Sequence, residues 1–132
     1  IVKEILDSEY NIIKKYQAEQ VRQTISPKTA KTMQSILREV VDDGTGIRAK
    51  LENYSAAGKT GTSQKFDFSL GRYSNKKFTS WFVGFAPSHK AEIAILVMLD
   101  EPKGSYYGGT VAAPVFQEIA TNVLPYLSIP PE

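Results

Sequence analysis

Four consecutive residues, Lys59, Thr60, Gly61 and Thr62, carry the clearest chemistry in this sequence. The flanking residues predict a strand, and alternate side chains of a strand share a face, so Thr60 and Thr62 are expected to point the same way. Their hydroxyls can hold a substrate carboxylate, while the ammonium of Lys59 supplies charge and a hydrogen-bond donor close to a reacting serine. These groups together predict anion binding and acyl transfer.

The backbone of the same strand can also take part. Gly61 has no side chain, so a ligand can approach the main chain there. If the strand lies at the rim of a sheet, its unpaired N–H and C=O groups can pair with an extended peptide, and the Thr62 N–H can donate to an oxyanion. For an isolated match of three residues, a polar turn in an ordinary strand is the simpler interpretation. The surrounding sequence therefore has to decide between them.

A phosphate-binding loop is a competing interpretation, because such loops also end in Gly-Lys-Thr. Its first glycine would have to stand at position 53, which is Asn53. Gly61, directly after the threonine, is also a poor opening for the helix that should follow. The spacing therefore disfavours nucleotide binding.

The composition is that of an ordinary globular protein, with 42% hydrophobic and 23% charged residues in a chain of 132, which fits one domain or part of one. A net charge of +2 and the lack of a basic stripe interleaved with aromatics argue against nucleic acid. The absence of cysteine excludes disulfides and a cysteine nucleophile. No His or carboxylate cluster has metal-ligand spacing, and His89 is expected at the surface, so neither a metal nor a cofactor is predicted.

Local sequence patterns predict one hairpin and two helices outside the central strands. Apolar-rich runs on either side of residues 7–10 predict a hairpin over about residues 1–16. Ser26 followed by Pro27 is typical of a helix start, and apolar residues at i, i+3, i+4, i+7 and i+8 from Met33 predict a helix over about residues 27–42. A second helix, over about residues 114–127, has a wide apolar face, and we expect a kink or an early end at Pro125.

Three adjacent antiparallel strands are predicted between about residues 55 and 99, at 55–63, 78–85 and 92–99. The connection over residues 64–77 has no clear period and is long for a hairpin loop in a compact domain. Two interpretations of it stay open, a solvated mobile excursion and a rim of the substrate site. The C-terminal helix is expected to cover one side of the sheet, which gives an α+β fold.

Four segments together carry a resemblance to a known family. They are residues 57–64 (Ala-Gly-Lys-Thr-Gly-Thr-Ser-Gln), 82–87 (Phe-Val-Gly-Phe-Ala-Pro), 106–109 (Tyr-Tyr-Gly-Gly) and 112–116 (Ala-Ala-Pro-Val-Phe). In this order and spacing the chain resembles the C-terminal part of a class B penicillin-binding protein, over nearly its whole length, and the tail at residues 128–132 resembles most the septal, cell-division transpeptidases. β-Lactamases share Lys-Thr-Gly, but the later segments favour the transpeptidase. The resemblance implies the antiparallel sheet and packed helices of a penicilloyl-serine transferase domain, with residues 1–132 as its C-terminal portion.

The resemblance also implies an activity. The parent enzyme would attack the penultimate D-Ala carbonyl of a peptidoglycan stem peptide with a serine, release the terminal D-Ala and pass the acyl group to an amine, and β-lactams would trap the same serine. Lys59 would polarise the hydrogen-bond network of that serine, Thr60 and Thr62 would bind the terminal carboxylate, and the Thr62 N–H would form half of the oxyanion hole. Tyr106 and Tyr107 would line the apolar side of the cleft, with aromatic packing beside a tight turn as the alternative.

The sequence departs from the family pattern in one large respect. The motifs Ser-x-x-Lys, with the nucleophile, and Ser-x-Asn should both precede Lys-Thr-Gly, and neither does. The formal match from Ser74 to Lys77 follows Lys59 and leads into a strand rather than starting a helix, so we interpret it as chance. We therefore expect an enzyme in the parent protein and an inactive isolated segment. The alternative is a non-catalytic module that binds peptide or scaffold partners by strand addition.

The chain opens at Ile1 without an initiating Met, so we expect it to be a piece of a longer protein. Its longest apolar run, Ile93 to Leu99, has the length of a buried strand rather than of a membrane span. By the resemblance, the parent acts at the outer face of the cytoplasmic membrane, anchored through an N-terminal helix that this chain lacks. The expected partners are stem peptides, β-lactams, the missing N-terminal part of the same domain and division-complex proteins.

Overall fold

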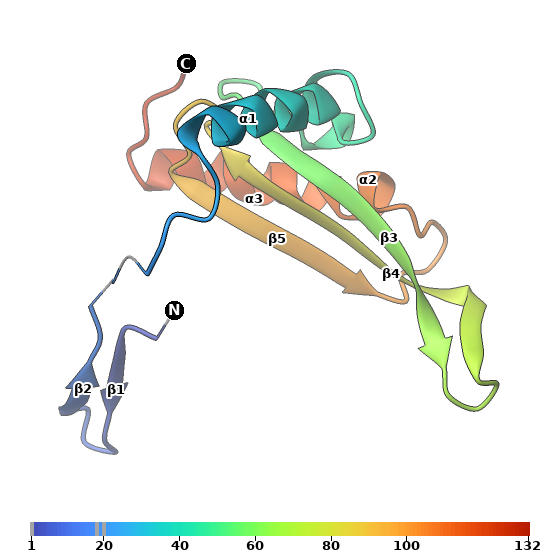
Figure 1. Cartoon of the computed structure of the whole chain (residues 1–132), viewed down its shortest axis with the longest axis horizontal. Helices are drawn as coiled ribbons and strands as arrows, with labels where there is room; N and C mark the ends of the chain where they lie inside the picture. Colours follow the sequence, from blue (N-terminus) through green and yellow to red (C-terminus); the bar gives the residue numbers. More distant parts are fainter. Residues whose placement is uncertain (1, 18, 20) are drawn as a thin grey trace.

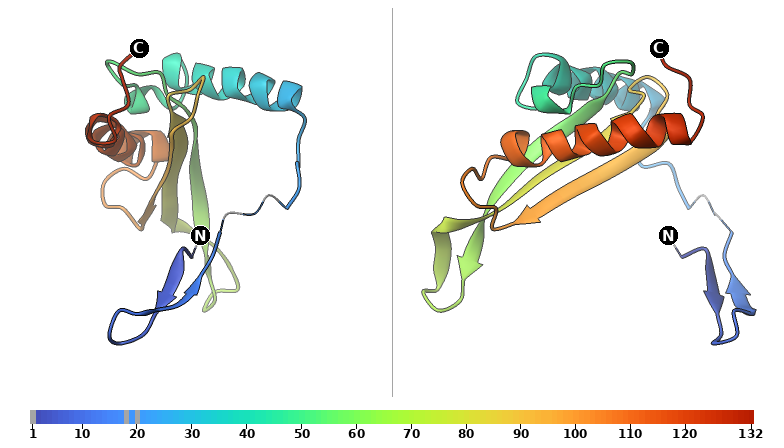
Figure 2. Two further views of the ribbon diagram at one scale, coloured as in Figure 1. Left: turned by 90° about the vertical axis from the view of Figure 1, so that its left-hand side faces the viewer. Right: turned by 180° about the vertical axis from the view of Figure 1, so that it is seen from behind.

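The computed structural model describes residues 2–17, 19 and 21–132 and has the α+β arrangement that the sequence predicts (Figure 1). Strands β3, β4 and β5 form an antiparallel sheet in that order, and β1 pairs with β2 in a separate hairpin. Helix α3 lies along one side of the sheet, and the N-terminal hairpin stands apart from it (Figure 2). The elements in chain order are β1 (Glu4–Leu6), β2 (Ile12–Lys15), α1 (Pro27–Asp42), the 3-10 helix η1 (Ile47–Ala49), β3 (Ala57–Asp67), β4 (Arg72–Ala86), β5 (Ile93–Asp100), α2 (Gly108–Val111) and α3 (Ala113–Tyr126).

The N-terminal hairpin is closed by its loop. The carboxylate of Asp7 accepts hydrogen bonds from the backbone N–H groups of Glu9, at 2.8 Å, and Asn11, at 2.9 Å, which fixes the turn between β1 and β2. Ile1, the first residue of the predicted hairpin, lies outside the described residues. The two strands are shorter than the apolar runs that predict them.

Helix α1 has the bounds that the sequence pattern predicts. The Ser26 side chain accepts a hydrogen bond from the Thr29 N–H at 3.1 Å, and Pro27 stands in the first turn, where no backbone donor is needed. The helix packs along β3 and buries Val41 fully. Met33 and Ile36, on the same apolar face, stay exposed. The apolar face of α1 is therefore covered only near its C-terminal end in the described chain.

One face of the sheet carries the core. Phe82 of β4 and Phe116 of α3 are fully buried, with ring centroids 4.9 Å apart. Thr60 pairs with Phe82 and Thr62 with Ser80, so both threonines lie on this covered face, because paired residues of antiparallel strands share a face. Helix α3 packs on β4 and β5, and the short helix α2 contacts β3, the strand that holds the candidate site.

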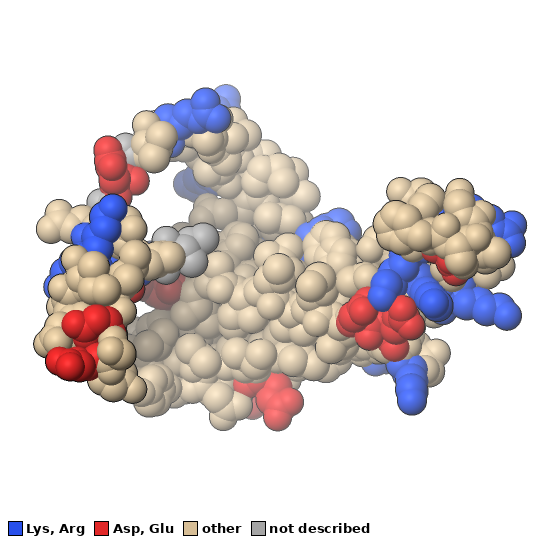
Figure 3. Space-filling view, turned by 90° about the horizontal axis from the view of Figure 1, so that it is seen from below, with Lys and Arg blue, Asp and Glu red and all other residues tan. Residues whose placement is uncertain are grey.

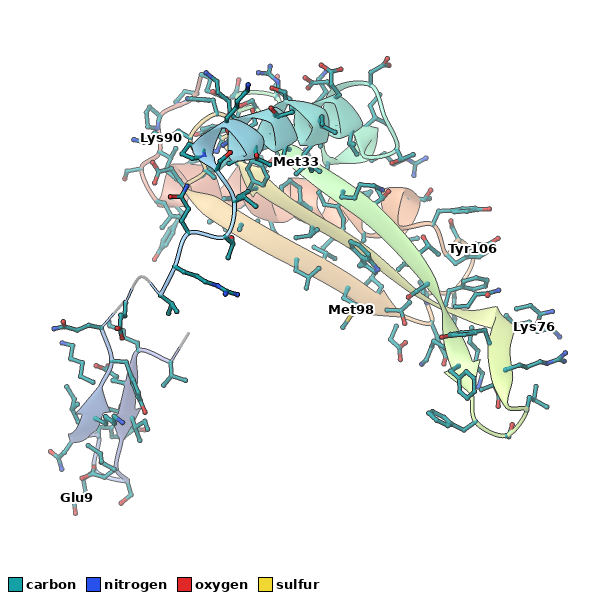
Figure 4. All side chains as sticks on the ribbon, viewed as in Figure 1. Glu9, Met33, Lys76, Lys90, Met98 and Tyr106 are labelled. Atoms are coloured by element: carbon teal, nitrogen blue, oxygen red, sulfur yellow. The ribbon has the colours of Figure 1, made fainter. Side chains whose placement is uncertain are left out.

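The opposite face of the sheet is open in the described chain. Lys59 and Gly61 pair with Val83 and Trp81 on this side. Along β5 it carries Leu96 and Met98, which are 63% and 65% exposed. Met98 is labelled on β5 in Figure 4. Exposed apolar side chains that lie together in this way are typical of interaction surfaces.

The structure corrects the prediction for residues 64–77. They are not an aperiodic loop, because β3 runs on to Asp67 and β4 begins at Arg72, so the strands are longer than 55–63 and 78–85. A bulge interrupts the ladder: Gln64 pairs with Phe78, and the next pair is Phe66 with Tyr73, which leaves residues 74–77 opposite residue 65. This bulge shifts the alternation of side chains, which is why the sequence shows no period here. The prediction of a long loop without regular structure was wrong, and both functional interpretations of this segment stay predictions.

The C-terminal helical region begins earlier than predicted and consists of two helices, α2 and α3. Phe116, Ala120 and Leu124 form the buried face of α3, as the apolar pattern indicates. Pro125 stands in the last turn, and the helix ends one residue later at Tyr126, so the early end is observed. No helix in the described ranges is both long enough and apolar enough to cross a membrane.

Candidate functional site

The two threonines of the predicted signature share a face and make different contacts. Thr60 Oγ1 lies 3.0 Å from Thr45 Oγ1, in the loop after α1. Thr62 Oγ1 accepts a hydrogen bond from the Gly108 N–H at 3.1 Å and donates to the Tyr106 carbonyl at 3.4 Å. The second bond is long, so the Thr62 proton is weakly held and can turn toward another acceptor.

A cavity of about 330 Å³ opens beside these hydroxyls. Thr45 and Arg48 line it from the segment before β3, Thr60 and Thr62 from β3 itself, and Tyr107 from the segment before α2. Hydroxyls and a guanidinium are the groups that bind carboxylates in proteins. The cavity therefore has the chemistry of an anion site, formed by segments far apart in the sequence.

Lys59 reaches the site from the other side of the strand. Its side chain starts on the open face, and Nζ donates to the Thr60 carbonyl at 2.9 Å. In an antiparallel pair the N–H and C=O of one residue face the same neighbour, and the facing alternates along the strand. Because the Thr60 carbonyl faces the Lys59 ammonium rather than β4, the backbone groups of Thr60 and Thr62 face the outer edge of β3.

That edge carries no second strand in the described part of the chain. Among the described residues, no carboxylate lies within 4.0 Å of the Lys59 ammonium. An extended ligand can therefore pair with the backbone of Thr60 and Thr62 while Lys59 stands beside it with its charge uncompensated.

Gly61 has a packing role that the sequence did not reveal. A Cβ built at this position would lie 1.9 Å from Cε2 of the Trp81 ring, so the indole covers the Cα of Gly61 on the open face. Glycine is therefore required at position 61 for a second reason besides the predicted ligand access to the backbone: any side chain would clash with Trp81. Gly108 is equally constrained, because a Cβ there would lie 2.3 Å from the Trp81 carbonyl and 2.4 Å from that of Gly61. A close approach between α2 and the sheet requires glycine at position 108.

The two predicted tyrosines have different positions. Tyr107 lines the cavity and is exposed. The Tyr106 ring stacks on Phe78, with centroids 4.1 Å apart and an interplanar angle of 10°. The two hydroxyls lie 3.3 Å apart, and the hydrogen bond to Tyr107 raises the pKa of Tyr106 above its ordinary value. Tyr106 therefore packs against Phe78 and Tyr107 and does not line the cavity.

Sequence reasoning missed Thr45 and Arg48. The Gly-Thr-Gly run at residues 44–46 is interpreted only as a helix end, whereas the structure brings the Thr45 hydroxyl to Thr60. Arg48 Nη1 lies 3.5 Å from the Thr110 carbonyl, at the limit of a hydrogen bond. Neither contact has a local sequence signal, because the partners are 15 and 62 residues away.

The formal Ser-x-x-Lys match lies outside this cavity. Ser74 Oγ accepts hydrogen bonds from the N–H groups of Lys76 and Lys77, within the bulge of β4 and not at a helix start. Among the described residues, no group of three or more His, Asp or Glu side chains is placed to hold a metal ion.

Comparison of the sequence with protein-family profiles identifies the family of this chain. A profile of the penicillin binding protein transpeptidase domain matches residues 1–121. The chain belongs to the penicillin-binding protein transpeptidase family. The probable peptidoglycan D,D-transpeptidase PbpC of Pseudomonas aeruginosa is 40% identical over 116 residues, which are 86% of this chain and 20% of that protein. The peptidoglycan D,D-transpeptidase FtsI of Buchnera aphidicola is 40% identical over 113 residues, covering 84% of this chain and 19% of the relative.

Solved structures of penicillin-binding proteins have the same fold. The TP domain of penicillin-binding protein 3 from Burkholderia pseudomallei is 38% identical, with a TM-score of 0.71 over 81% of this chain and 32% of that one. Penicillin binding protein 3 from Mycobacterium tuberculosis, complexed with ampicillin, is 29% identical, with a TM-score of 0.81 over 99% of this chain and 31% of that one. The predicted class B family and fold class are confirmed. The transpeptidase segment described here spans about a fifth of its curated relatives.

Proposed function

We propose that this chain supplies one wall of the active site of a peptidoglycan D,D-transpeptidase. The observation that carries the proposal is the cavity beside β3, which the side chains of Thr60, Thr62 and Arg48 line together. The D-Ala-D-Ala end of a stem peptide lies along this edge as an added strand, and β-lactams occupy the same place. The ampicillin complex of a relative with this fold supports the second part.

The terminal carboxylate of the stem peptide binds in the cavity. Thr60 and Thr62 donate their hydroxyl protons to it, the latter by turning away from the distant Tyr106 carbonyl. Arg48 supplies positive charge on the same face. The side chain of Lys59 starts on the opposite face of the sheet. Arg48 therefore interacts with the substrate carboxylate, and Lys59 interacts with the reacting serine.

The acyl-transfer step uses the strand backbone. The serine Oγ forms a bond to the penultimate D-Ala carbonyl carbon while its proton passes to the lysine of the Ser-x-x-Lys motif, and Lys59 polarises this hydrogen-bond network. The proton then goes from that lysine to the nitrogen of the leaving D-Ala. The Thr62 N–H, on the outer edge of β3, donates to the developing oxyanion. Collapse of the tetrahedral intermediate breaks the C–N bond and releases D-Ala, and an amine of a second stem peptide then takes the acyl group and restores the serine.

The remainder of the site comes from the preceding part of the same protein. Two features support this: the open face with Leu96 and Met98, and the outer edge of β5, which has no strand partner in the described ranges. A missing N-terminal part of the domain covers this face and brings the Ser-x-x-Lys and Ser-x-Asn motifs to β3. The isolated segment is inactive for lack of the nucleophile.

We place the parent protein at the outer face of the cytoplasmic membrane, with its anchor in the preceding sequence and division proteins as its partners. Relatives named FtsI and PbpC, both D,D-transpeptidases, support the wall-synthesis role. Stage V sporulation protein D of Bacillus subtilis, 40% identical over 111 residues, is a relative with a different cellular role in its name. The septal assignment therefore rests on the tail at residues 128–132.

A fluorescent penicillin tests the proposed function. The full-length protein is expected to become covalently labelled, and these 132 residues alone are expected to stay unlabelled. Labelling of the isolated chain at Ser74 or any other serine would contradict the assignment of the nucleophile to the preceding part. A full-length protein that folds and takes no label would favour the non-catalytic binding module.

A further inference from the structure

The outer part of the β3–β4 hairpin, residues 66–77, is here called the hairpin tip. It projects beyond the sheet and away from the helices (Figures 1 and 4). Phe66 contacts Phe68 and Tyr73 edge to face, with ring centroids 5.1 Å and 5.4 Å apart. Phe68 is 90% exposed, and Tyr73 is exposed as well. Phe66 thus links two exposed aromatic rings into one apolar surface that is open to water.

The tip also carries three cations. Arg72, Lys76 and Lys77 make no ion pair among the described residues. Figure 3 shows basic side chains gathered over this end of the molecule. Lys65, just before the tip, is by contrast neutralised by Asp100 and Glu101, both 2.8 Å away.

The one acidic residue of the tip is held by its own turn. The Asp67 carboxylate accepts hydrogen bonds from the N–H groups of Ser69, at 3.0 Å, and Leu70, at 3.3 Å. The bond from the Ser69 hydroxyl contributes most to lowering the Asp67 pKa, and the charge of Lys77 adds to it. The tip therefore carries three cations and one carboxylate, a net charge of +2 over residues 66–77.

A hollow of about 560 Å³ lies at the tip. Its charged lining consists of Arg72, Lys76, Lys77 and the single carboxylate Asp67, and Leu70 and Tyr73 line it as well. A ligand that fits this hollow has flat apolar faces and negative groups at its periphery. Sugar rings that carry carboxylated substituents have this combination, since their C–H faces stack on aromatic rings and their carboxylates pair with Arg and Lys.

The tip continues the strand that holds the proposed acyl-transfer site. From Thr62 to Phe66 the strand rises about 13 Å at about 3.3 Å per residue. We propose that the hairpin tip docks the anionic glycopeptide strand of peptidoglycan whose stem peptide enters the site. Sugar faces stack on Phe68 and Tyr73, and carboxylates of neighbouring stems pair with the cations of the tip. This inference rests on the proposed function and extends it from a single stem peptide to the polymer.

Co-sedimentation of the full-length protein with purified insoluble peptidoglycan tests the proposal. The double variant Lys76→Glu with Lys77→Glu is expected to bind roughly tenfold more weakly, and Phe68→Ser with Tyr73→Ser to lose a similar factor. The matched control, Lys28→Glu with Lys31→Glu, makes the same charge change on exposed positions of α1 and is expected to leave binding unchanged. Peptidoglycan with its carboxylates amidated is expected to bind wild type and the Lys76/Lys77 variant equally.

Penicillin labelling separates this proposal from the one on which it rests. Penicillin is a small ligand of the β3 edge, so both tip variants are expected to be labelled at the wild-type rate, which also shows that they fold. Absence of labelling in the wild-type protein would overturn the proposed function. Normal labelling with unchanged sedimentation of both tip variants would overturn the docking proposal and assign the tip to another partner, such as an acidic protein. Equal losses of peptidoglycan binding in the Lys76/Lys77 and Lys28/Lys31 variants would also overturn it, because the loss would then follow from net charge alone.

Discussion

The inner and outer halves of the β3–β4 hairpin are made of the same two strands and have opposite surroundings. The inner half, from Ala57 to Gln64, pairs in unbroken register with β4, and Trp81 and Gly108 contact the backbone of Gly61 from its two faces. The outer half follows a bulge and exposes its aromatic rings. Catalytic groups need fixed positions, whereas a surface that binds a polymer has to project from the domain. The bulge separates the rigid inner half of the hairpin from the projecting outer half.

The largest expected effect contrasts one lysine from each half. In the full-length protein, Lys59→Ala is expected to slow acylation by fluorescent penicillin by about 10²–10³-fold, because it removes a charge at the reacting centre. Lys76→Ala, in the outer half, is expected to leave the rate unchanged. Stopped-flow labelling rates of the two variants measure the difference. Equal losses would show that the wrong lysine has been assigned to the chemistry.

The next effect contrasts two glycines. Gly108→Ala brings a Cβ within 2.4 Å of the Gly61 carbonyl oxygen. The substitution is expected to lower the free energy of unfolding by about 3 kcal/mol, because the backbone of β3 or of α2 would have to shift to relieve the clash. Gly71→Ala in the turn of the outer half meets nothing within 4 Å, and its positive φ of 62° sets a smaller cost of about 1 kcal/mol. Urea unfolding of the full-length variants gives both values.

A third effect contrasts Arg48 at the cavity with Arg72 at the tip. Arg48→Gln is expected to weaken recognition of a carboxylate-terminated substrate about tenfold, the loss of one charged hydrogen bond, and to leave its carboxamide analogue unaffected. Arg72→Gln at the tip serves as the control, with both short substrates processed as by wild type. Parallel losses on both analogues in Arg48→Gln would assign this residue to structure rather than to carboxylate recognition.

Local patterns predicted what local interactions determine. The start of α1 followed from Ser26 and Pro27, and the shared face of Thr60 and Thr62 from strand alternation. The bulge at residues 74–77 was missed because it removes the period on which strand prediction depends. Thr45 and Arg48 were missed because their contacts join the cavity from distant segments, which no spacing of side chains along the sequence reports.

The smallest effect is a pH dependence confined to the outer half. The hydrogen bond from Ser69 holds the pKa of Asp67 below its ordinary value of 3.8, so the charged form stabilises the turn above that pH, and the stabilisation is lost as pH falls through the lower folded pKa. Hydrogen exchange of the Ser69 and Leu70 amides, corrected for its intrinsic pH dependence, is therefore expected to lose protection in acid. Asp67→Asn keeps an acceptor oxygen for the turn and is expected to abolish this dependence. Amides of residues 57–63, a stretch without a carboxylate, should show no such change if they are monitored in the same experiment. A parallel loss of protection there would mean that acid loosens the whole hairpin, and the two halves would then not be independent.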